Sequence, residues 1–263
     1  MNILQAVILG IVQGITEFLP ISSSGHLIVL QRVFGIEEPA LTFDIVVHLG
    51  TLVSIIAVFW ADIVAIIKKP FSKMTGLLIV GTIPVVVAGY LMRNVIETHF
   101  RTGLWLAAAF TLTGVLLVLA DRFKKGYKEE RDITWFDALF IGCCQALAIP
   151  PGISRSGTTI TGALTRGLNR KTAARFSFLL AMIAIAGAGV LETYEVMQDG
   201  ARVEAIGIMS LIFGFLAAAL VGYLCIRLLL KLIEACKLRY FSFYLWGLAA
   251  LIFVDYFFVN HFF

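Results

Sequence analysis

Charged residues are scarce in this chain of 263 residues. Asp, Glu, Lys and Arg make up 14% of the sequence, whereas soluble domains usually contain about 25%. Hydrophobic residues make up 60%, against about 45–50% in soluble domains. One aqueous fold of this length cannot bury so much apolar surface, and lipid is the solvent that accepts it. The composition therefore excludes an ordinary soluble domain and indicates a polytopic membrane protein.

Cysteine is scarce as well, and the start of the chain lacks the features of a cleaved signal peptide. The four cysteines lie in or beside apolar stretches, at spacings that match neither a metal site nor a disulfide framework. The first residues include neither a basic segment nor a small-residue cleavage site. We therefore expect unpaired, packed cysteines and an N-terminal segment that remains in the folded protein.

Six apolar runs are long enough to cross a bilayer as helices. They occupy residues 41–61, 76–92, 104–120, 172–192, 206–229 and 241–259. Two further apolar regions are interrupted, residues 3–34 around Pro20 and residues 135–167 around Pro150. Irregular backbone at membrane depth is tolerated only where protein or a water-filled cavity covers it. We therefore predict an all-α membrane protein with six transmembrane helices and two re-entrant helix hairpins.

Lysine and arginine are distributed unevenly over the two sides of this arrangement. Sixteen of the 21 fall on the side opposite the N-terminus, and four fall on the N-terminal side. Cytoplasmic loops carry an excess of Lys and Arg, so we predict that both termini lie outside the cytoplasm. The net charge of +4 follows from this bias and does not indicate nucleic-acid binding.

The two interrupted regions match each other at an offset of 132 residues. Gly10, Gln13, Ser22, Ser24 and Gly25 correspond to Gly142, Gln145, Ser154, Ser156 and Gly157. These matches predict a single membrane domain (1–263) built from two copies of a hairpin plus three spans, at 1–120 and 133–259. Because three is odd, the second copy is inverted, and both hairpins can meet near the midplane, as in many transporters.

The two breaks contain the residue types that phosphate chemistry needs. Glu17, Ser23 and His26 lie in the first break, and Arg155 lies in the second. Arginine is a bidentate donor suited to phosphate, and helix N-termini bind anions. Ser23 and His26 have the spacing of a nucleophile and its base on one helix face. The residues expected to contact a substrate around them are Ser22, Ser24, Gly25, Ser154, Ser156, Gly157, Thr158 and Gln13.

Each of these residue types also has a structural interpretation. The serines can be helix N-caps, and Glu17 can simply pair with Arg155. Gln13 and Gln145 favour hydrogen bonding in a network over catalysis. For His48, a role in helix packing is favoured over support of the site.

The motifs QGITEFLPISSSGH (13–26) and PGISRSGTT (151–159) resemble those of the bacterial undecaprenyl-diphosphate phosphatases, the bacitracin-resistance family. The resemblance covers essentially the whole chain. It implies removal of the terminal phosphate from undecaprenyl diphosphate in the cell membrane, which recycles the lipid carrier of peptidoglycan precursors. It also implies functional roles for Glu17, Ser23, His26 and Arg155.

The resemblance further implies a divalent cation, magnesium or calcium, that bridges the diphosphate, with Glu17 as its ligand. The family often has glutamate where this chain has Gln13, so Glu17 is the one carboxylate on this turn. The nucleophile stays open between Ser23, with His26 or Glu17 as base, and a water activated by Glu17 and a cation.

A lipid or solute transporter of the inverted-repeat type, alone or combined with phosphatase activity, is the competing interpretation, because fold does not fix function. The paired serine-rich motifs favour phosphate chemistry, which a simple carrier does not need. The expected partners are a polyprenyl diphosphate substrate and membrane lipid, and the sequence leaves homo-oligomerisation open.

Overall fold

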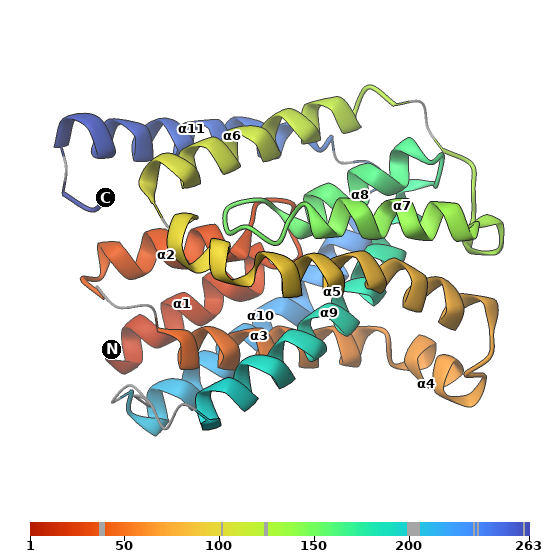
Figure 1. Cartoon of the computed structure of the whole chain (residues 1–263), viewed down its shortest axis with the longest axis horizontal. Helices are drawn as coiled ribbons and strands as arrows, with labels where there is room; N and C mark the ends of the chain where they lie inside the picture. The colour runs from red at the N-terminus through yellow and green to blue at the C-terminus, as the bar shows by residue number, and fades with distance from the viewer. Residues whose placement is uncertain are drawn as a thin grey trace.

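The described part of the chain is almost entirely helical in the computed structural model (Figure 1). The structure describes residues 1–36, 40–100, 102–123, 126–198, 206–233, 235, 237–259 and 261–263. Among the basic residues and cysteines counted from the sequence, Arg101, Lys124, Lys125, Arg202 and Cys236 lie outside this part of the chain.

Six helices within the described residues are long and apolar enough to cross a membrane. They are α3 (Leu41–Val58), α5 (Lys73–His99), α6 (Gly103–Ala120), α9 (Arg170–Gln198), α10 (Ile208–Leu232) and α11 (Arg239–Val254), the last extended by the π-helical turn η2 (Asp255–Val259). The apolar window of each helix lies within three residues of one of the predicted runs, and α5 and α9 extend seven and six residues beyond theirs. The prediction of a multi-pass membrane protein with six long apolar helices is therefore confirmed.

Four shorter helices fill the two interrupted regions. They are α1 (Ile3–Thr16) and α2 (Ser23–Val33) in the first region, and α7 (Trp135–Ala146) and α8 (Arg155–Thr165) in the second. Capping boxes at Asn2 and Thr134 begin α1 and α7, because each side chain satisfies a free N–H of the first turn. Ser22 caps α2, so of Ser22, Ser23 and Ser24 the N-cap interpretation holds for Ser22, and Ser154 caps α8 in the same way.

Two smaller elements complete the chain. α4 (Trp60–Lys68) follows α3 after a break at Phe59, which the predicted run 41–61 does not anticipate. The 3-10 turn η1 (Glu130–Asp132) precedes α7.

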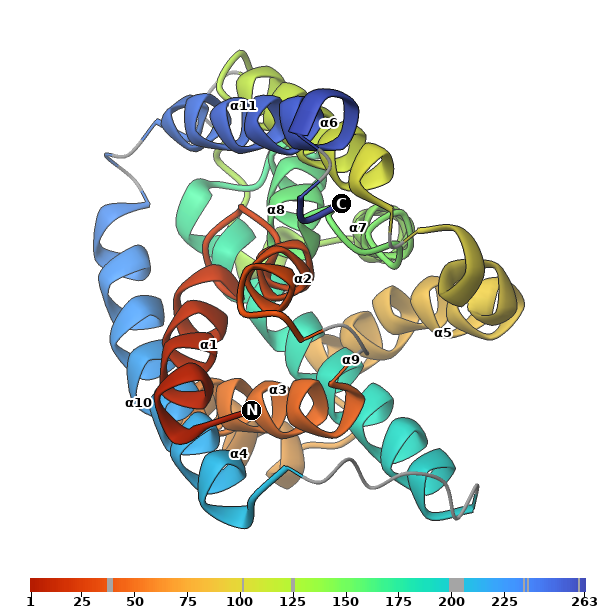
Figure 2. The same ribbon diagram turned by 90° about the vertical axis from the view of Figure 1, so that its left-hand side faces the viewer.

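Helices from distant parts of the chain lie side by side. α1 packs against α10, α10 against α3, α5 against α7, and α6 against α11. Both termini lie at the same end of the long axis (Figure 1). Seen from that end, the four short helices of the interrupted regions lie at the centre, with α10, α5 and the α6–α11 pair around them (Figure 2).

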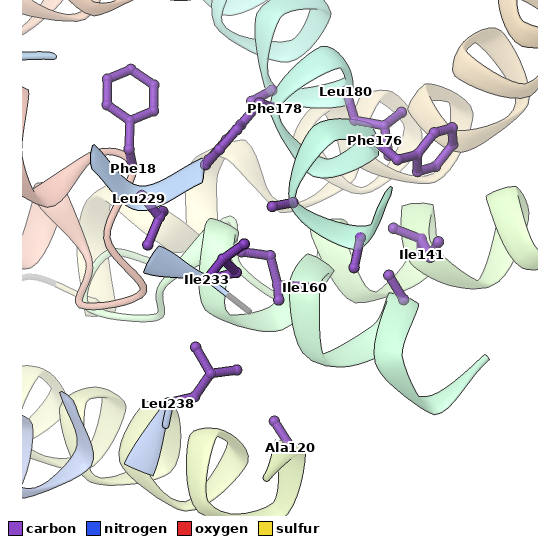
Figure 3. Close-up of a cluster of buried hydrophobic side chains, with 14 of the residues drawn as sticks. Phe18, Ala120, Ile141, Ile160, Phe176, Phe178, Leu180, Leu229, Ile233 and Leu238 are labelled. Atoms are coloured by element: carbon purple, nitrogen blue, oxygen red, sulfur yellow. The ribbon is translucent and has the colours of Figure 1, made fainter. Parts of the chain in front are cut away.

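An apolar core packs beside these central helices. The rings of Phe18 and Phe178 meet edge to face with centroids 5.7 Å apart, and Figure 3 shows them among buried aliphatic residues such as Ile160 and Leu229. Half of the apolar window of α6 and of α9 is buried, against 17% of that of α5. α5 therefore turns most of its apolar surface outward, as expected of a helix that faces lipid.

Glycine permits close approach of helices at two places. Gly10 of α1 lies against the backbone of Gly214 in α10, and Gly142 of α7 lies against the backbone of Gly81 in α5. A Cβ atom at Gly10 or Gly142 would collide with the facing carbonyl oxygen. The helices therefore pack backbone to backbone, as small residues allow in membrane proteins.

Asp137 anchors α7 at the end of the molecule opposite the termini. Its buried carboxylate accepts hydrogen bonds from Lys128 Nζ at 2.9 Å and from Arg166 Nε at 2.7 Å. Burial by itself raises the pKa of Asp137, but the hydrogen bonds from Lys128, the Thr134 N–H and Arg166 lower it to about 2. The carboxylate therefore stays ionised near neutral pH and joins the segment before α7 to the end of α8.

The close approach at Gly142 can be tested through stability. Gly142→Leu inserts a side chain between α7 and α5, and we expect it to cost at least about 1–3 kcal/mol, as overpacking of a dense core does. Thermal unfolding in detergent should show a lower midpoint. Gly89→Leu on α5 is the matched control, because a Cβ atom there meets nothing within 4 Å. Equal midpoints for the two variants would contradict the close packing of α5 and α7.

Candidate active site

The turns of the two interrupted regions meet at the carboxylate of Glu17. Glu17 is the C-cap residue of α1 and is 6% exposed. Ser23 Oγ donates a hydrogen bond to Glu17 Oε2, and Arg155 Nη2 donates to Glu17 Oε1. Ser23 and Arg155 are the first residues of α2 and α8. Two helix N-termini that are far apart in the sequence therefore meet at one carboxylate.

Further hydrogen bonds join the two turns directly. Ser156 Oγ donates to the Leu19 carbonyl at 3.0 Å. The Gly152 N–H donates to Ser24 Oγ at 3.4 Å. These bonds satisfy polar groups that would be costly against lipid, and they hold the turns in one relative position.

α6 supports the second turn from its other side. Trp105 Nε1 donates to the Pro151 carbonyl at 2.8 Å, and the Ser154 N–H donates to Thr113 Oγ1 at 3.2 Å. Sequence reasoning missed Trp105 and Thr113. Each resembles an ordinary interfacial or packing residue of a span, and nothing in the sequence shows which turn α6 contacts.

Ser22 adopts an unusual backbone conformation in the first turn. Its φ of 71° is the one positive value for a non-glycine residue in the described chain. Such a conformation costs on the order of 1–3 kcal/mol and persists only where the surroundings determine it. Here it reverses the chain between Glu17 and α2, so that Ser23 faces the carboxylate while Ser22 Oγ accepts from the Gly25 N–H at 3.4 Å.

His26 lies one turn beyond Ser23, but its ring nitrogens contact other groups. Nδ1 lies 2.6 Å from the Ser22 carbonyl oxygen, and Nε2 lies 2.7 Å from the Tyr244 hydroxyl on α11. The Ser23 hydroxyl donates instead to Glu17. Of the two bases considered from the sequence, Glu17 is therefore the one in contact with Ser23.

Two polar side chains complete the surroundings of Glu17. Gln13 Nε2 donates to Glu17 Oε2 at 3.1 Å, in agreement with a network role. His48 Nε2 lies 3.7 Å from Glu17 Oε2, so this histidine of α3 lies at the site and does more than pack helices. Neither amide atom of buried Gln145 has a hydrogen-bond partner within the described chain, so the network predicted for it is not formed.

The other predicted substrate contacts lie in the first turns of α2 and α8. Thr158 Oγ1 donates to the Arg155 carbonyl of its own helix at 2.9 Å. Gly25 packs closely against the Phe110 ring, and Gly157 packs against Ser154. These three residues shape the first turns, which leaves Ser23 and Arg155 as the side chains that reach the centre.

The arrangement suits a negatively charged ligand. The first turns of α2 and α8 contribute N–H groups and the positive ends of two helix dipoles. Arg155 has five N–H donors in a rigid fork, so it can contact Glu17 and a second oxyanion together. Burial lowers the local dielectric and strengthens these interactions. A hydroxyl, a carboxylate and a guanidinium at one point are the groups that phosphoryl transfer uses.

A divalent cation also fits this centre. Within the described residues, no group of three or more His, Cys, Asp or Glu side chains could hold a metal ion by itself. Magnesium, however, is commonly held by one or two carboxylates together with phosphate oxygens of the substrate. Gln13 Oε1 is buried without a hydrogen-bond partner among the described residues, and its amide group contacts Glu17. One carboxylate and one unpaired amide oxygen therefore offer ligands that a diphosphate would complete.

The fold and the site together define a polytopic membrane protein with a buried cluster of Glu17, Ser23 and Arg155. Residues 6–251 match the family model described as "Bacitracin resistance protein BacA". This chain belongs to that family.

Curated relatives are similar over nearly their whole length. The undecaprenyl-diphosphatase of Carboxydothermus hydrogenoformans is 48% identical over 254 residues, which cover 97% of each chain. Undecaprenyl-diphosphatase 4 of Bacillus cereus is 46% identical over 252 residues, which cover 96% of each chain. The undecaprenyl-diphosphatase of Methanosphaera stadtmanae is 41% identical over 266 residues, which cover 93% of this chain and 94% of the relative.

The contact between Glu17 and Arg155 can be tested through stability. Glu17→Gln leaves the partly buried Arg155 charge without its partner, and loss of one member of a buried ion pair typically costs about 3–5 kcal/mol. Arg155→Gln should be costly for the same reason. The double variant should lose less than the sum of the two single losses, measured as free energies of unfolding in detergent. Additive losses would show that the two side chains do not interact.

Proposed function

We propose that this chain hydrolyses undecaprenyl diphosphate to undecaprenyl phosphate and inorganic phosphate. The reaction recycles the lipid carrier of peptidoglycan synthesis and so confers resistance to bacitracin. The three relatives described above carry the name undecaprenyl-diphosphatase, and each aligns with more than nine-tenths of this chain. The observation that carries the proposal is the meeting of Ser23 and Arg155 at the Glu17 carboxylate.

Ser23 is the proposed nucleophile, and Glu17 is its base. Ser23 Oγ attacks the terminal phosphorus, its proton passes to Glu17, and the P–O bond to undecaprenyl phosphate breaks. Glu17 passes this proton to the departing undecaprenyl phosphate. Water then attacks the phosphoserine as Glu17 takes one of its protons, and that proton returns to Ser23 Oγ as the P–O bond breaks, which releases inorganic phosphate and restores the hydroxyl. The alternative is a direct attack by water that Glu17 activates, in which Ser23 only orients the phosphate.

Arg155 and the helix N-termini act on the charge of the transferred phosphoryl group. Groups fixed in place before the reaction stabilise developing charge without reorganising, and phosphoryl transfer depends mainly on such stabilisation and on positioning. Glu17 and Gln13 would hold a magnesium or calcium ion together with the diphosphate. Such an ion would neutralise phosphate charge when bound.

We also propose that the interrupted regions are re-entrant hairpins in an inverted repeat. In support, Gly10 and Gly142 are sequence-matched, and so are their packing partners Gly214 and Gly81. The first region packs on a helix of the second half, and the second region packs on a helix of the first half. This reciprocal pattern is expected of two copies of one unit related by pseudo-symmetry.

The proposed orientation places both termini outside the cytoplasm, in the bacterial cell membrane. In support, Lys128, Arg166, Arg170 and Arg175 lie next to helix ends, in the segment before α7, after α8 and in the first turns of α9, where the sequence predicts the cytoplasmic side. A central site between two halves also fits a lipid transporter. The contact of Ser23 with Glu17 favours hydrolysis, because transport alone does not need an activated hydroxyl.

The orientation can be tested by labelling single cysteines in intact cells, after the native cysteines have been replaced. Gly207 and Tyr127 lie at opposite ends of the molecule, and both are exposed. A membrane-impermeant thiol reagent should label Gly207→Cys and leave Tyr127→Cys unlabelled until the cells are opened. The reverse pattern would overturn the orientation.

The nucleophile can be tested by phosphate release from polyprenyl diphosphate at saturating substrate. Ser23→Ala should reduce turnover by about 100-fold or more if Ser23 attacks the phosphorus. Ser22→Ala is the local control, because it loses only an N-cap contact worth about 1 kcal/mol of stability. If folded Ser23→Ala keeps more than about a tenth of wild-type turnover, the barrier has risen by less than about 1.4 kcal/mol, and attack by Glu17-activated water replaces the serine mechanism.

A further inference from the structure

The side chain of His26 is held by two groups that differ in chemistry. Its Nδ1 lies 2.6 Å from the carbonyl oxygen of Ser22, four residues earlier in the chain. Its Nε2 lies 2.7 Å from the hydroxyl of Tyr244, which lies 218 residues later, on α11. A polar contact of this length in a buried site fixes both the position and the protonation pattern of the ring.

The contact with Ser22 determines which nitrogen carries the proton. A carbonyl oxygen can only accept, so Nδ1 of His26 must be the protonated nitrogen that donates. In the neutral ring, Nε2 is then left with a lone pair. The hydroxyl of Tyr244 can donate, and it therefore donates to Nε2.

Aromatic contacts hold the same ring from the side. The rings of His26 and Tyr244 are stacked, with centroids 5.6 Å apart and an interplanar angle of 11°. The Phe110 ring of α6 lies against the His26 ring with centroids 5.4 Å apart, close to edge-on at 68°. His26 is buried, with 7% of its surface exposed, whereas Tyr244 is half exposed. α6 and α11 therefore form an aromatic slot in which Tyr244 covers the imidazole of His26 from outside.

We propose that Tyr244 is a positioning residue that holds His26 in the active site, with Nδ1 protonated and Nε2 as the hydrogen-bond acceptor. This inference rests on the proposed phosphatase function for its catalytic consequence, but its structural part stands alone. Without the Tyr244 hydroxyl, Nε2 loses its buried partner. The ring is then free to turn or to adopt the other tautomer, which breaks its bond to Ser22. Tyr244 thereby couples the last membrane helix to the turn that presents Ser23.

The kinetic test compares Tyr244→Phe with wild type and with Tyr240→Phe. Tyr244→Phe keeps the stacked ring and removes only the hydroxyl. We expect kcat to fall about tenfold with KM within about twofold, because a displaced His26 releases the Ser22 carbonyl and shifts the Ser23 hydroxyl from its attacking position. Tyr240, one turn earlier and exposed on α11, is the matched control, and its variant should match wild type. Unchanged kcat in Tyr244→Phe would overturn the proposal.

A double variant separates positioning from a general structural effect. If Tyr244 acts through His26, adding Tyr244→Phe to His26→Gln should cause no further fall in turnover. If Tyr244→Phe lowers turnover by the same factor in the wild type and in His26→Gln, Tyr244 acts independently of His26 and the proposal is overturned.

A measurement without substrate tests the structural part. Nitrogen-15 NMR of the four histidines in the detergent-solubilised protein should show a ring with a protonated Nδ1 and an unprotonated Nε2 whose signal vanishes in His26→Gln. His48, whose Nδ1 lies 2.7 Å from the Asp44 carbonyl oxygen, is assigned separately with His48→Gln. In Tyr244→Phe the Nε2 shift of His26 should move, while Tyr240→Phe should leave it in place. An unmoved shift would overturn the positioning role. Wild-type protein that releases no phosphate but shows these shifts would overturn the proposed function and not this contact.

Discussion

The ion pair between Glu17 and Arg155 joins the two turns at the centre of an apolar helix assembly. Each turn interrupts a helix and exposes backbone groups that lipid cannot satisfy. Each turn provides partners for backbone groups of the other, and the carboxylate at the end of α1 accepts hydrogen bonds from the side chains of Ser23 and Arg155. An isolated charge on either side would be expensive to bury. The pair therefore makes the two breaks stable only in each other's presence.

The same constraint explains why the site has so many polar neighbours. Ser156 and Ser24 satisfy backbone groups of the opposite turn, and Trp105 satisfies the carbonyl of Pro151. A serine with positive φ completes the first reversal. Polar side chains that satisfy backbone also hold the reactive groups still, so structural and chemical roles coincide in these turns. Ser22 and Ser154 therefore cap their helices, and this structural role does not weaken the case for Ser23 as the nucleophile.

The long helices could be predicted because a bilayer imposes one length and one composition on them. Their apolar windows agree with the predicted runs to within three residues, although α5 and α9 continue six or seven residues further. Glu17, Ser23 and Arg155 could be found because polar residues are conspicuous inside apolar segments. Tyr244, Trp105 and Thr113 could not, since a tyrosine, a tryptophan or a threonine in a span is unremarkable until its neighbouring helix is known. His48 was assigned mainly to packing for the same reason. The choice of Glu17 over His26 as the partner of Ser23 depends on side-chain directions, which spacing along a helix does not determine.

The exchange of packing partners between the two halves has a consequence for biosynthesis. α1 is synthesised first, but the helix it packs against, α10, ends at Leu232. During translation, the surface of α1 that packs against α10 therefore stays uncovered until nearly the whole chain has been synthesised. Glu17 lies before the segment between α6 and α7, and Arg155 lies after it, so neither half contains both members of the ion pair. A chain that ends before α10 therefore lacks the surface against which α1 packs, and one that ends before α8 lacks the partner of Glu17.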